Sequence, residues 1–284
     1  MKRILLTARN GQVGWELERT LAPLGEVVAV DRAALDLSNA DRVRAVVRDT
    51  RPDVIVNAAA YTAVDKAESE PELAMAINGT APGVFAEEAK RSGALLVHYS
   101  TDYVFDGTKQ GVYTEADATN PVNTYGRTKL AGEQAIQAVG GRHLILRTTW
   151  VYGQRGNNFF RTMLRLANDR PELRVVMDQI GAPTWSRMIA EGTAALLARG
   201  EPAEGLFHMT ADGETSWHGF AVAILRAAGL TTRVTPITTA EYPTPAARPA
   251  NSRLDCSLLR SACGIALPDW ALQLSLCQGE NASS

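Results

Sequence analysis

The chain has 284 residues, of which 45% are hydrophobic and 21% are charged, so it is long enough for one large folded domain or two interlocked ones. With a formal net charge of -2, the chain lacks the excess of basic residues that is typical of nucleic-acid-binding proteins. The apolar stretch near the amino terminus is too short for a signal peptide, and no stretch approaches the roughly 18 apolar residues of a membrane-spanning helix. We therefore expect a cytoplasmic protein without nucleic-acid or membrane partners.

Cysteine and histidine are too scattered to indicate a metal site. Cys256, Cys263 and Cys277 show no C-x-x-C spacing, and the four histidines lie far apart in the sequence. We expect buried thiols, packed or exposed imidazoles, and no bound metal.

Apolar runs of strand length alternate with longer helical patterns over the first half of the chain. Strands are predicted at 3–8, 26–31, 52–60, 93–100 and 143–150, and helices at 11–25, 38–50, much of 71–92 and from residue 123 onward. The strands are almost continuously apolar, which is typical of a parallel sheet covered by helices on both faces. The sequence therefore predicts an α/β fold with a Rossmann-type, doubly wound parallel sheet.

The regular alternation weakens after Tyr152. Residues 155–169 have a helical pattern, 173–178 and 205–210 are predicted as short strands, and a loop and helix are predicted at 181–200. We expect a dinucleotide-binding domain at 1–152, to which 184–212 returns. A smaller C-terminal substrate-binding domain would consist of 153–183 and 213–284.

The first chemical motif is "ARNGQVG", at residues 8–14, between the first strand and the first helix. Gly11 and Gly14 fit a G-x-x-G-x-x-G turn that brings backbone N–H groups close to a pyrophosphate at a helix N-terminus, whereas Ala8 stands where the first glycine belongs. A simple strand–turn–helix is the alternative. Asp31, at the end of the second strand, favours the dinucleotide because a carboxylate there binds ribose hydroxyls.

The cofactor is predicted to be NADPH or NADH. Asp31 favours NADH because it would repel a 2'-phosphate, and the adjacent Arg32 favours NADPH because its guanidinium pairs with that phosphate. The expected cofactor contacts are Gly11, Gln12, Val13, Gly14, Asp31, Arg32, Asp36, Leu37, Ala58, Ala59, Ala60, Tyr125 and Lys129.

The segment "YGRTK" places Tyr125 and Lys129 four residues apart at the start of a predicted helix. This spacing puts the phenol and the ammonium on one face, where a cation lowers the phenol pKa toward a value useful in proton transfer. A surface pair without function is the alternative, and the nearby dinucleotide motif favours catalysis.

The segment "HYSTDYVFDG", at 98–107, is a predicted strand that ends in Ser100, Thr101 and Asp102. Ligands bind at the carboxyl edge of open parallel sheets, so these side chains are expected at a site. A capping or turn role for Ser100 and Thr101 is the alternative.

Eight segments in order along nearly the whole chain resemble the dTDP-4-dehydrorhamnose reductases, a family of extended short-chain dehydrogenases/reductases. They are "NGQVG", "NAAAYTAVDKAE", "STDYVFDG", "YGRTKLAGE", "RTTWVYG", "GNNF", "DQIGAPT" and "PANSRL". The resemblance implies reduction of the C4 ketone of dTDP-6-deoxy-L-lyxo-4-hexulose to dTDP-L-rhamnose. It further implies that Tyr125 donates the proton, that Lys129 holds the nicotinamide ribose and tunes Tyr125, and that Thr101 hydrogen-bonds the reacting oxygen.

The resemblance also implies where the substrate binds. Asp102 and Trp150 would contact the sugar ring. The segments "GNNF", which contains Asn157, "DQIGAPT" and "ARPANSR" would hold the deoxythymidine diphosphate. Arg248 and Arg253 are chosen as diphosphate contacts for their charge. The full set of expected substrate contacts is Asp102, Tyr103, Trp150, Asn157, Arg248 and Arg253.

Two departures from the family pattern affect cofactor binding and assembly. The methyl group of Ala8 would push the turn away from the pyrophosphate. Arg187 stands where some members carry a glutamate that binds magnesium between subunits, so we expect a monomer or weak homodimer without bridging metal.

Two other functions fit this sequence. One is a 4-ketoreductase for another nucleotide deoxysugar. The other is a non-catalytic regulator resembling the beta subunit of methionine adenosyltransferase, although Thr101, Tyr125 and Lys129 argue against it.

Overall fold

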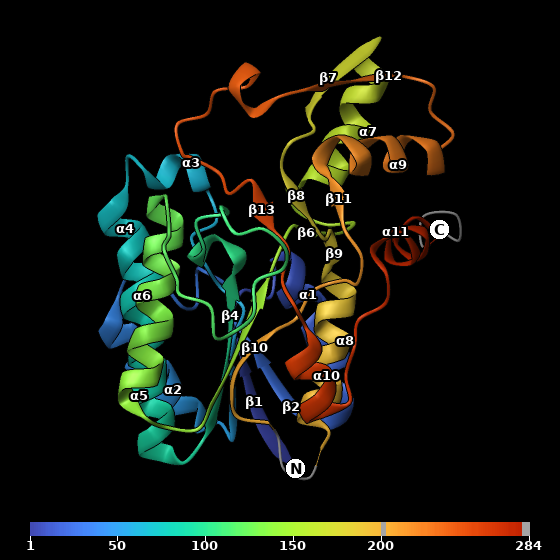
Figure 1. Ribbon diagram of the computed structural model, residues 1–284. Helices are drawn as coiled ribbons and strands as arrows, with labels where there is room; N and C mark the ends of the chain where they lie inside the picture. Colours follow the sequence, from blue (N-terminus) through green and yellow to red (C-terminus); the bar gives the residue numbers. More distant parts are fainter. Residues whose placement is uncertain (200–202, 280–284) are drawn as a thin grey trace.

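The computed structural model, which describes residues 1–199 and 203–279, is built around a six-stranded parallel sheet (Figure 1). The strand order is β10-β5-β4-β3-β1-β2. The strands are β1 (Lys2–Leu6), β2 (Gly25–Ala29), β3 (Val54–Asn57), β4 (Leu95–Thr101), β5 (His143–Thr148) and β10 (Gly205–His208). The order reverses between β1 and β3, so their carboxyl ends form the crevice in which such sheets bind ligands.

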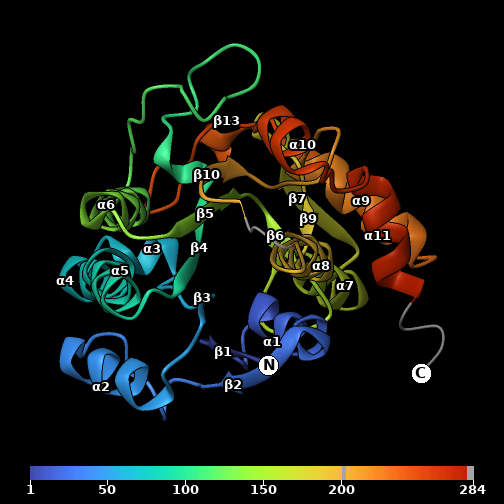
Figure 2. The same cartoon turned by 90° about the horizontal axis from the view of Figure 1, so that it is seen from below.

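Helices cover both faces of this sheet, as Figure 2 shows. One face carries α2 (Ala40–Thr50), α4 (Pro71–Met75), α5 (Ala81–Ser92) and α6 (Thr124–Val139), and the other carries α1 (Gln12–Thr20), α8 (Ser186–Leu197) and α10 (Ser257–Cys263). Val43, Phe85 and Ile136 pack in the core of the first face, while Leu17 and Ile189 pack in that of the second. The predicted doubly wound fold is confirmed.

The helix predicted over much of 71–92 is interrupted by a π-helical turn, η2 (Ala76–Thr80), between α4 and α5. Inside that turn, the side chain of Asn78 bonds the backbone N–H and C=O of Tyr61 and the hydroxyl of Thr128. A Cβ on Gly132 of α6 would lie 2.2 Å from the Asn78 carbonyl oxygen, so the turn and α6 are in close contact. The N-terminus of α2 is capped by Asn39, whose side chain accepts the N–H of Arg42.

A second lobe lies beyond the carboxyl edge of the sheet, at the upper right of Figure 1. Its strands pair as β12 (Arg233–Ile237) with β7 (Glu172–Val176), and as β11 (Thr215–Ser216), β8 (Ile180–Gly181) and β13 (Asn251–Ser252). Helices α7 (Phe159–Asp169), α9 (Trp217–Ala227) and α11 (Trp270–Gly279) share its core. The pair β6 (Val151–Tyr152) and β9 (Thr184–Trp185) joins the lobe to the sheet.

The remaining elements are short. They are α3 (Val64–Ala67) and the 3₁₀ turns η1 (Ala22–Leu24), η3 (Asp102–Val104) and η4 (Thr239–Glu241). Leu259 of α10 packs in the core of the sheet although it falls within 213–284. We propose that 1–152 with 184–212 binds the dinucleotide, and that 153–183 with 213–284 binds the substrate.

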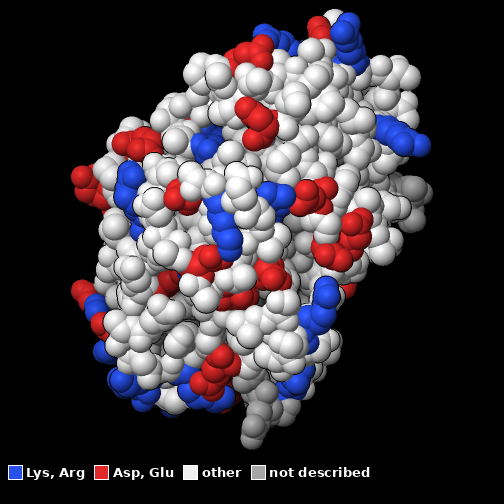
Figure 3. Space-filling view, in the orientation of Figure 1, with Lys and Arg blue, Asp and Glu red and all other residues white. Residues whose placement is uncertain are grey.

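On the face seen in Figure 3, Lys and Arg alternate with Asp and Glu over most of the surface, and a small group of acidic side chains lies just below the centre. Within residues 1–199 and 203–279, none of the helices combines the length and the apolar character needed to cross a membrane.

A buried ion pair joins α6 to the sheet. The guanidinium of Arg147 on β5 donates to both carboxylate oxygens of Glu133 on α6, over 2.9 and 2.6 Å, and the two side chains are only 4% and 2% exposed. The Arg147 guanidinium also lies 5.0 Å from the ring centroid of Phe105. Removing one partner of such a pair leaves an uncompensated charge in the interior.

We expect Arg147→Met to lower the free energy of unfolding by about 3–5 kcal/mol, because Glu133 then remains buried without its partner. The double variant Arg147→Met/Glu133→Leu, which removes both charges, should recover most of this loss. Urea denaturation of the three proteins measures the difference. A single variant as stable as the parent would contradict this account of α6.

Candidate active site

The turn after β1 adopts the geometry that a dinucleotide-binding loop requires. Ala8 has a φ of 56°, a left-handed conformation that costs an L-residue about 1–2 kcal/mol and that glycine adopts freely. A Cβ on Gly14 would lie 2.0 Å from the carbonyl oxygen of Ala8, so this position requires glycine. Gly11 precedes α1 without a side-chain cap, which leaves the first N–H groups of α1 available to an anion.

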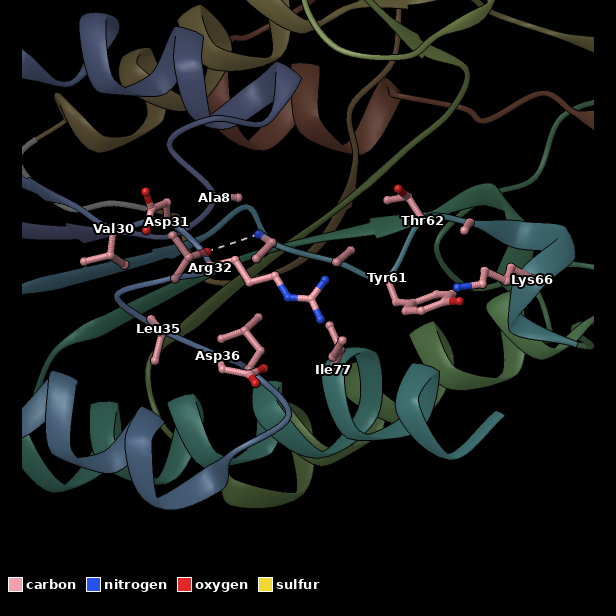
Figure 4. A pocket seen from close by; sticks show the side chains of 15 residues that line it. Ala8, Val30, Asp31, Arg32, Leu35, Asp36, Tyr61, Thr62, Lys66 and Ile77 are labelled. Carbon is pink, nitrogen blue, oxygen red and sulfur yellow. Dashed lines mark hydrogen bonds between the residues drawn. The ribbon is translucent and has the colours of Figure 1, made fainter. Parts of the chain in front are cut away.

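A cavity of about 380 Å³ opens beside this turn at the ends of β1, β2 and β3 (Figure 4). Six predicted cofactor residues line it: Asp31, Arg32, Asp36, Leu37, Ala59 and Ala60. Thr7, Tyr61, Thr62, Lys66 and Ile77 also line it and were not predicted. Gly11, Gln12, Val13 and Gly14 belong instead to the adjoining turn and α1, Ala58 packs against the core of the sheet, and Tyr125 and Lys129 lie outside the cavity on α6. The cavity and the turn together fit a dinucleotide.

Asp31 and Arg32 face this cavity in different ways. One Asp31 oxygen accepts the N–H groups of Ala33 and Ala34, at 3.0 and 3.1 Å, and the other accepts the side chain of Asn10 at 3.4 Å. The exposed side chain of Arg32 extends into the cavity toward Ile77 in Figure 4. One oxygen of the Asp31 carboxylate is therefore already bonded to backbone N–H groups of its own turn, while the Arg32 guanidinium extends into the cavity.

Tyr125 and Lys129 lie in the first two turns of α6, whose N-terminus is capped by Asn123 through the N–H of Gly126 at 2.8 Å. Burial raises the pKa of Tyr125 to about 12, the negative charge of Asp102 adds to this, and hydrogen bonding with Thr101 partly offsets it. This is the opposite of the lowering that we expected from Lys129.

The ammonium of Lys129 is directed into the sheet. Its Nζ donates to the carbonyl oxygen of Tyr99 over 2.6 Å and lies 3.1 Å from Nε2 of His98. Burial lowers the pKa of Lys129 to about 8, against an opposing effect of the Glu133 charge. Lys129 is therefore close to its titration point near neutral pH.

Thr101 and Asp102 lie at the carboxyl end of β4. The Thr101 hydroxyl donates to Asp102 over 3.0 Å and accepts the N–H of Tyr103, so Thr101 also has the capping role considered above. Burial raises the pKa of Asp102 to about 6, although the neighbouring hydroxyls of Ser252, Thr101 and Thr149 oppose the rise. Within the described residues, the buried hydroxyls of Ser100 and Thr148 have no hydrogen-bond partner.

Two aromatic residues extend this edge. Tyr103 packs edge-on against Tyr125, with ring centroids 5.4 Å apart. Trp150 follows β5 with a φ of 45° and stacks on Trp217 of the second lobe, with centroids 3.6 Å apart and planes 10° apart. A Cβ on Gly181 would lie 2.7 Å from the same Trp150 ring. The half-buried Trp150 indole is therefore in close contact with both Gly181 and Trp217, a partner that the sequence did not reveal.

The two arginines chosen as diphosphate contacts do not share a cavity. Arg248 lines a cavity of about 450 Å³ in the second lobe and pairs with Asp65 over 2.8 Å. Arg253 lines a different cavity, of about 380 Å³, and pairs with Glu214 over 3.2 Å. The cavity of Arg248 is also lined by Phe159 and Gln179, from two segments expected to hold the diphosphate, and by Met163, Trp217 and Tyr242, which were not predicted.

The segment after β6 contacts the dinucleotide turn through Asn158, while Asn157, which was predicted as a substrate contact, is exposed. Asn158 caps α7 and donates from Nδ2 to Oε1 of Gln12 over 2.8 Å. Beside it, the guanidinium of Arg155 lies 3.5 Å from the centroid of the Trp15 ring on α1. The turn and the second lobe are therefore in direct contact.

Comparison with known proteins agrees with this arrangement. The family model of the RmlD substrate binding domain matches residues 1–281. The dTDP-4-dehydrorhamnose reductase of Burkholderia thailandensis is 53% identical over 290 residues, which cover 97% of each chain, and that of Salmonella typhimurium is 50% identical over 282 residues, 95% of this chain and 94% of that protein. The chain belongs to the dTDP-4-dehydrorhamnose reductase family.

Solved structures of the dTDP-4-dehydrorhamnose reductase family superpose closely on this chain. The enzyme of Clostridium acetobutylicum has a TM-score of 0.94 and 40% identity, covering 99% of both chains. That of Bacillus anthracis, in complex with NADP, has the same TM-score and 37% identity, covering 98% of this chain and 99% of its own. The predicted family resemblance is confirmed.

We expect Gly181→Ala to displace the Trp150 indole and to lower the free energy of unfolding by about 1–3 kcal/mol, because the added methyl group overlaps the ring. Urea denaturation measures the loss, and tryptophan emission reports the changed stack. Gly279→Ala is the matched control, since a Cβ there meets nothing within 4 Å. Equal stability and unchanged emission in both variants would argue against a close contact between Gly181 and the Trp150 ring.

Proposed function

We propose that this chain reduces the C4 ketone of dTDP-6-deoxy-L-lyxo-4-hexulose to dTDP-L-rhamnose with NADPH or NADH. Its membership in the dTDP-4-dehydrorhamnose reductase family supports this activity. The observation that carries the proposal is the meeting of Tyr125, Thr101 and buried Lys129 at the carboxyl edge of the sheet, the same edge at which the cavity opens.

The electrostatics suit a reductase. With a pKa raised to about 12, Tyr125 keeps its proton at neutral pH, as the proton donor of a ketone reduction must. Negative charge develops on the ketone oxygen during reduction, so donors directed at that oxygen stabilise the transition state more than the ground state. We assign the proton transfer to Tyr125, the second hydrogen bond to Thr101, and contact with the nicotinamide ribose to Lys129.

The cofactor, when bound, supplies the hydride. The uncapped N-terminus of α1 would hold its pyrophosphate, and Asp31 and Arg32 would meet its adenosine ribose. The Bacillus anthracis relative was solved with NADP, which supports NADPH as one of the two cofactors.

The second lobe would hold the nucleotide part of the substrate. Arg248 brings a cation to a cavity that also contains the aromatic rings of Phe159 and Trp217, a combination that suits a diphosphate beside a base. Trp150 lies against Trp217, so it would reach the sugar between this cavity and Tyr125. We also propose that Asp102 and Tyr103 contact the sugar, while Asn157 and Arg253 remain predicted contacts of the substrate.

We further propose that the protein is cytoplasmic and that it is a monomer or weak homodimer without a bridging metal. Arg187, at the position where some family members carry a magnesium-binding glutamate, pairs with Glu16 over 2.9 Å. The described residues contain no cluster of metal-ligating side chains.

Incubation with NADPH and the 4-keto sugar made in situ from dTDP-glucose, followed by NMR of the product, tests the activity. dTDP-L-rhamnose is the expected product. A product of different stereochemistry would indicate a ketoreductase of another deoxysugar route. Cofactor binding without turnover would indicate the regulatory alternative.

We expect Tyr125→Phe to lower kcat by about 10² or more while cofactor affinity stays near normal, because only the proposed proton donor is removed. Lys129→Ala should differ by weakening both cofactor binding and rate. Steady-state kinetics combined with cofactor titration separates the two effects. Near-normal turnover of Tyr125→Phe would refute the assignment.

We expect kcat/KM for NADPH and NADH to lie within about tenfold, equivalent to ~1.4 kcal/mol, because Asp31 and Arg32 act in opposite directions. Arg32→Ala should shift the preference toward NADH, whereas Arg32→Lys, which keeps the charge, should shift it less. Kinetics with both cofactors on the three proteins decides this. A preference beyond a hundredfold, or no response to losing Arg32, would show that one side chain does not meet the ribose.

A further inference from the structure

A line of buried polar side chains crosses the sheet from the cofactor cavity to Lys129. The hydroxyl of Thr7 donates to Oδ1 of Asn57 over 2.9 Å, and Nδ2 of Asn57 lies 3.2 Å from Nδ1 of His98. Nε2 of His98 then lies 3.1 Å from Nζ of Lys129. All four side chains are at most 2% exposed. The reaction proposed above assigns a role only to Lys129.

The orientation of the Asn57 amide determines which His98 nitrogen carries the proton. The Thr7 hydroxyl accepts the backbone N–H of Ala59 at 3.1 Å and donates its own proton to Oδ1 of Asn57, which also lies 3.4 Å from that N–H. The N–H groups of Nδ2 therefore point at Nδ1 of His98, which must accept. Burial lowers the pKa of His98 well below 6.5, and the charge of Lys129 lowers it further, so the ring is neutral. Its one proton is consequently on Nε2, facing Lys129.

This tautomer distinguishes the two forms of Lys129. A neutral amine has a lone pair that accepts the Nε2–H of His98, and it still donates to the carbonyl oxygen of Tyr99 at 2.6 Å. An ammonium has no lone pair, so the Nε2–H would point at its N–H groups. The ring thus favours the uncharged form of Lys129.

We propose that His98 is a positioning residue whose tautomer, fixed by Asn57, sets the pH at which Lys129 loses its charge. The consequence for catalysis rests on the proposed function, in which charged Lys129 binds the ribose hydroxyls. The titratable and charged side chains on the surrounding elements are Tyr99 on β4, Asp102 after it, Tyr125 and Glu133 on α6, and Arg147 on β5. Glu133 opposes the effect of His98, and its charge is already paired with Arg147.

The imidazole nitrogen shifts of ¹⁵N-histidine-labelled protein, recorded without cofactor or substrate, test the tautomer directly. We expect His98 to be neutral and protonated on Nε2 at pH 7. His208 is the internal control: it is also buried, with its pKa lowered to about 3, but its Nδ1 lies 3.2 Å from the carbonyl oxygen of Asp255 and must donate. The two rings should show opposite tautomers. The perturbation caused by Lys129→Met assigns the His98 signals, and an Nδ1–H tautomer or an imidazolium would overturn the proposal.

The pH dependence of kcat/KM tests the consequence. In His98→Gln, the side-chain amide oxygen of the glutamine can accept a hydrogen bond from the Lys129 ammonium, which stabilises the charged form. The alkaline limb of the kcat/KM profile should therefore move to higher pH by about one unit. His208→Gln should leave the limb in place. A folded His98→Gln protein with an unmoved limb would overturn the proposal, because a purely structural role predicts lower activity at every pH. If the parent protein does not reduce the sugar, the proposed function fails, and the nitrogen spectrum still decides the tautomer.

Discussion

The ion pair between Glu133 and Arg147 fixes the position of α6, and the proposed chemistry depends on that position. Both charges are buried and held by two hydrogen bonds, so α6 cannot slide along the sheet without exposing an unpaired charge to the interior. Gly132, one residue earlier, lets α6 approach the π-helical turn at Asn78. These contacts on the middle of α6 place its first two turns, with Tyr125 and Lys129, at the carboxyl edge of the sheet.

Burial has opposite effects on the two ionisable groups of α6. It raises the pKa of the Tyr125 phenol and lowers that of the Lys129 ammonium, because each neutral form is favoured in a desolvated site. The same apolar environment therefore keeps the Tyr125 phenol, which we assign as the proton donor, protonated, and it makes the Lys129 ammonium easier to deprotonate. Sequence spacing reveals that the two side chains share a helix face, but it does not reveal how deeply that face is buried.

The sequence was sufficient to predict what depends on local pattern: the parallel sheet, the dinucleotide turn, and the Tyr125–Lys129 pair. It could not predict features that depend on contacts between distant segments. The π-helical turn carries Asn78, whose side chain bonds Tyr61 and a residue of α6, and the partner of Trp150 comes from the other lobe. Charge alone also could not separate Arg248 from Arg253, because their cavities are formed by different loops.

The hydrogen bond between Gln12 and Asn158 makes the dinucleotide turn part of the framework of the second lobe. Asn158 caps α7, so the amide that fixes the start of that helix is the same one that contacts the turn. The stacking of Arg155 on Trp15 adds a second attachment a few residues away. A substitution of Gln12 or Asn158 therefore removes a hydrogen bond that joins the two lobes. A redesign of the cofactor site has to treat positions 12 and 158 as a pair.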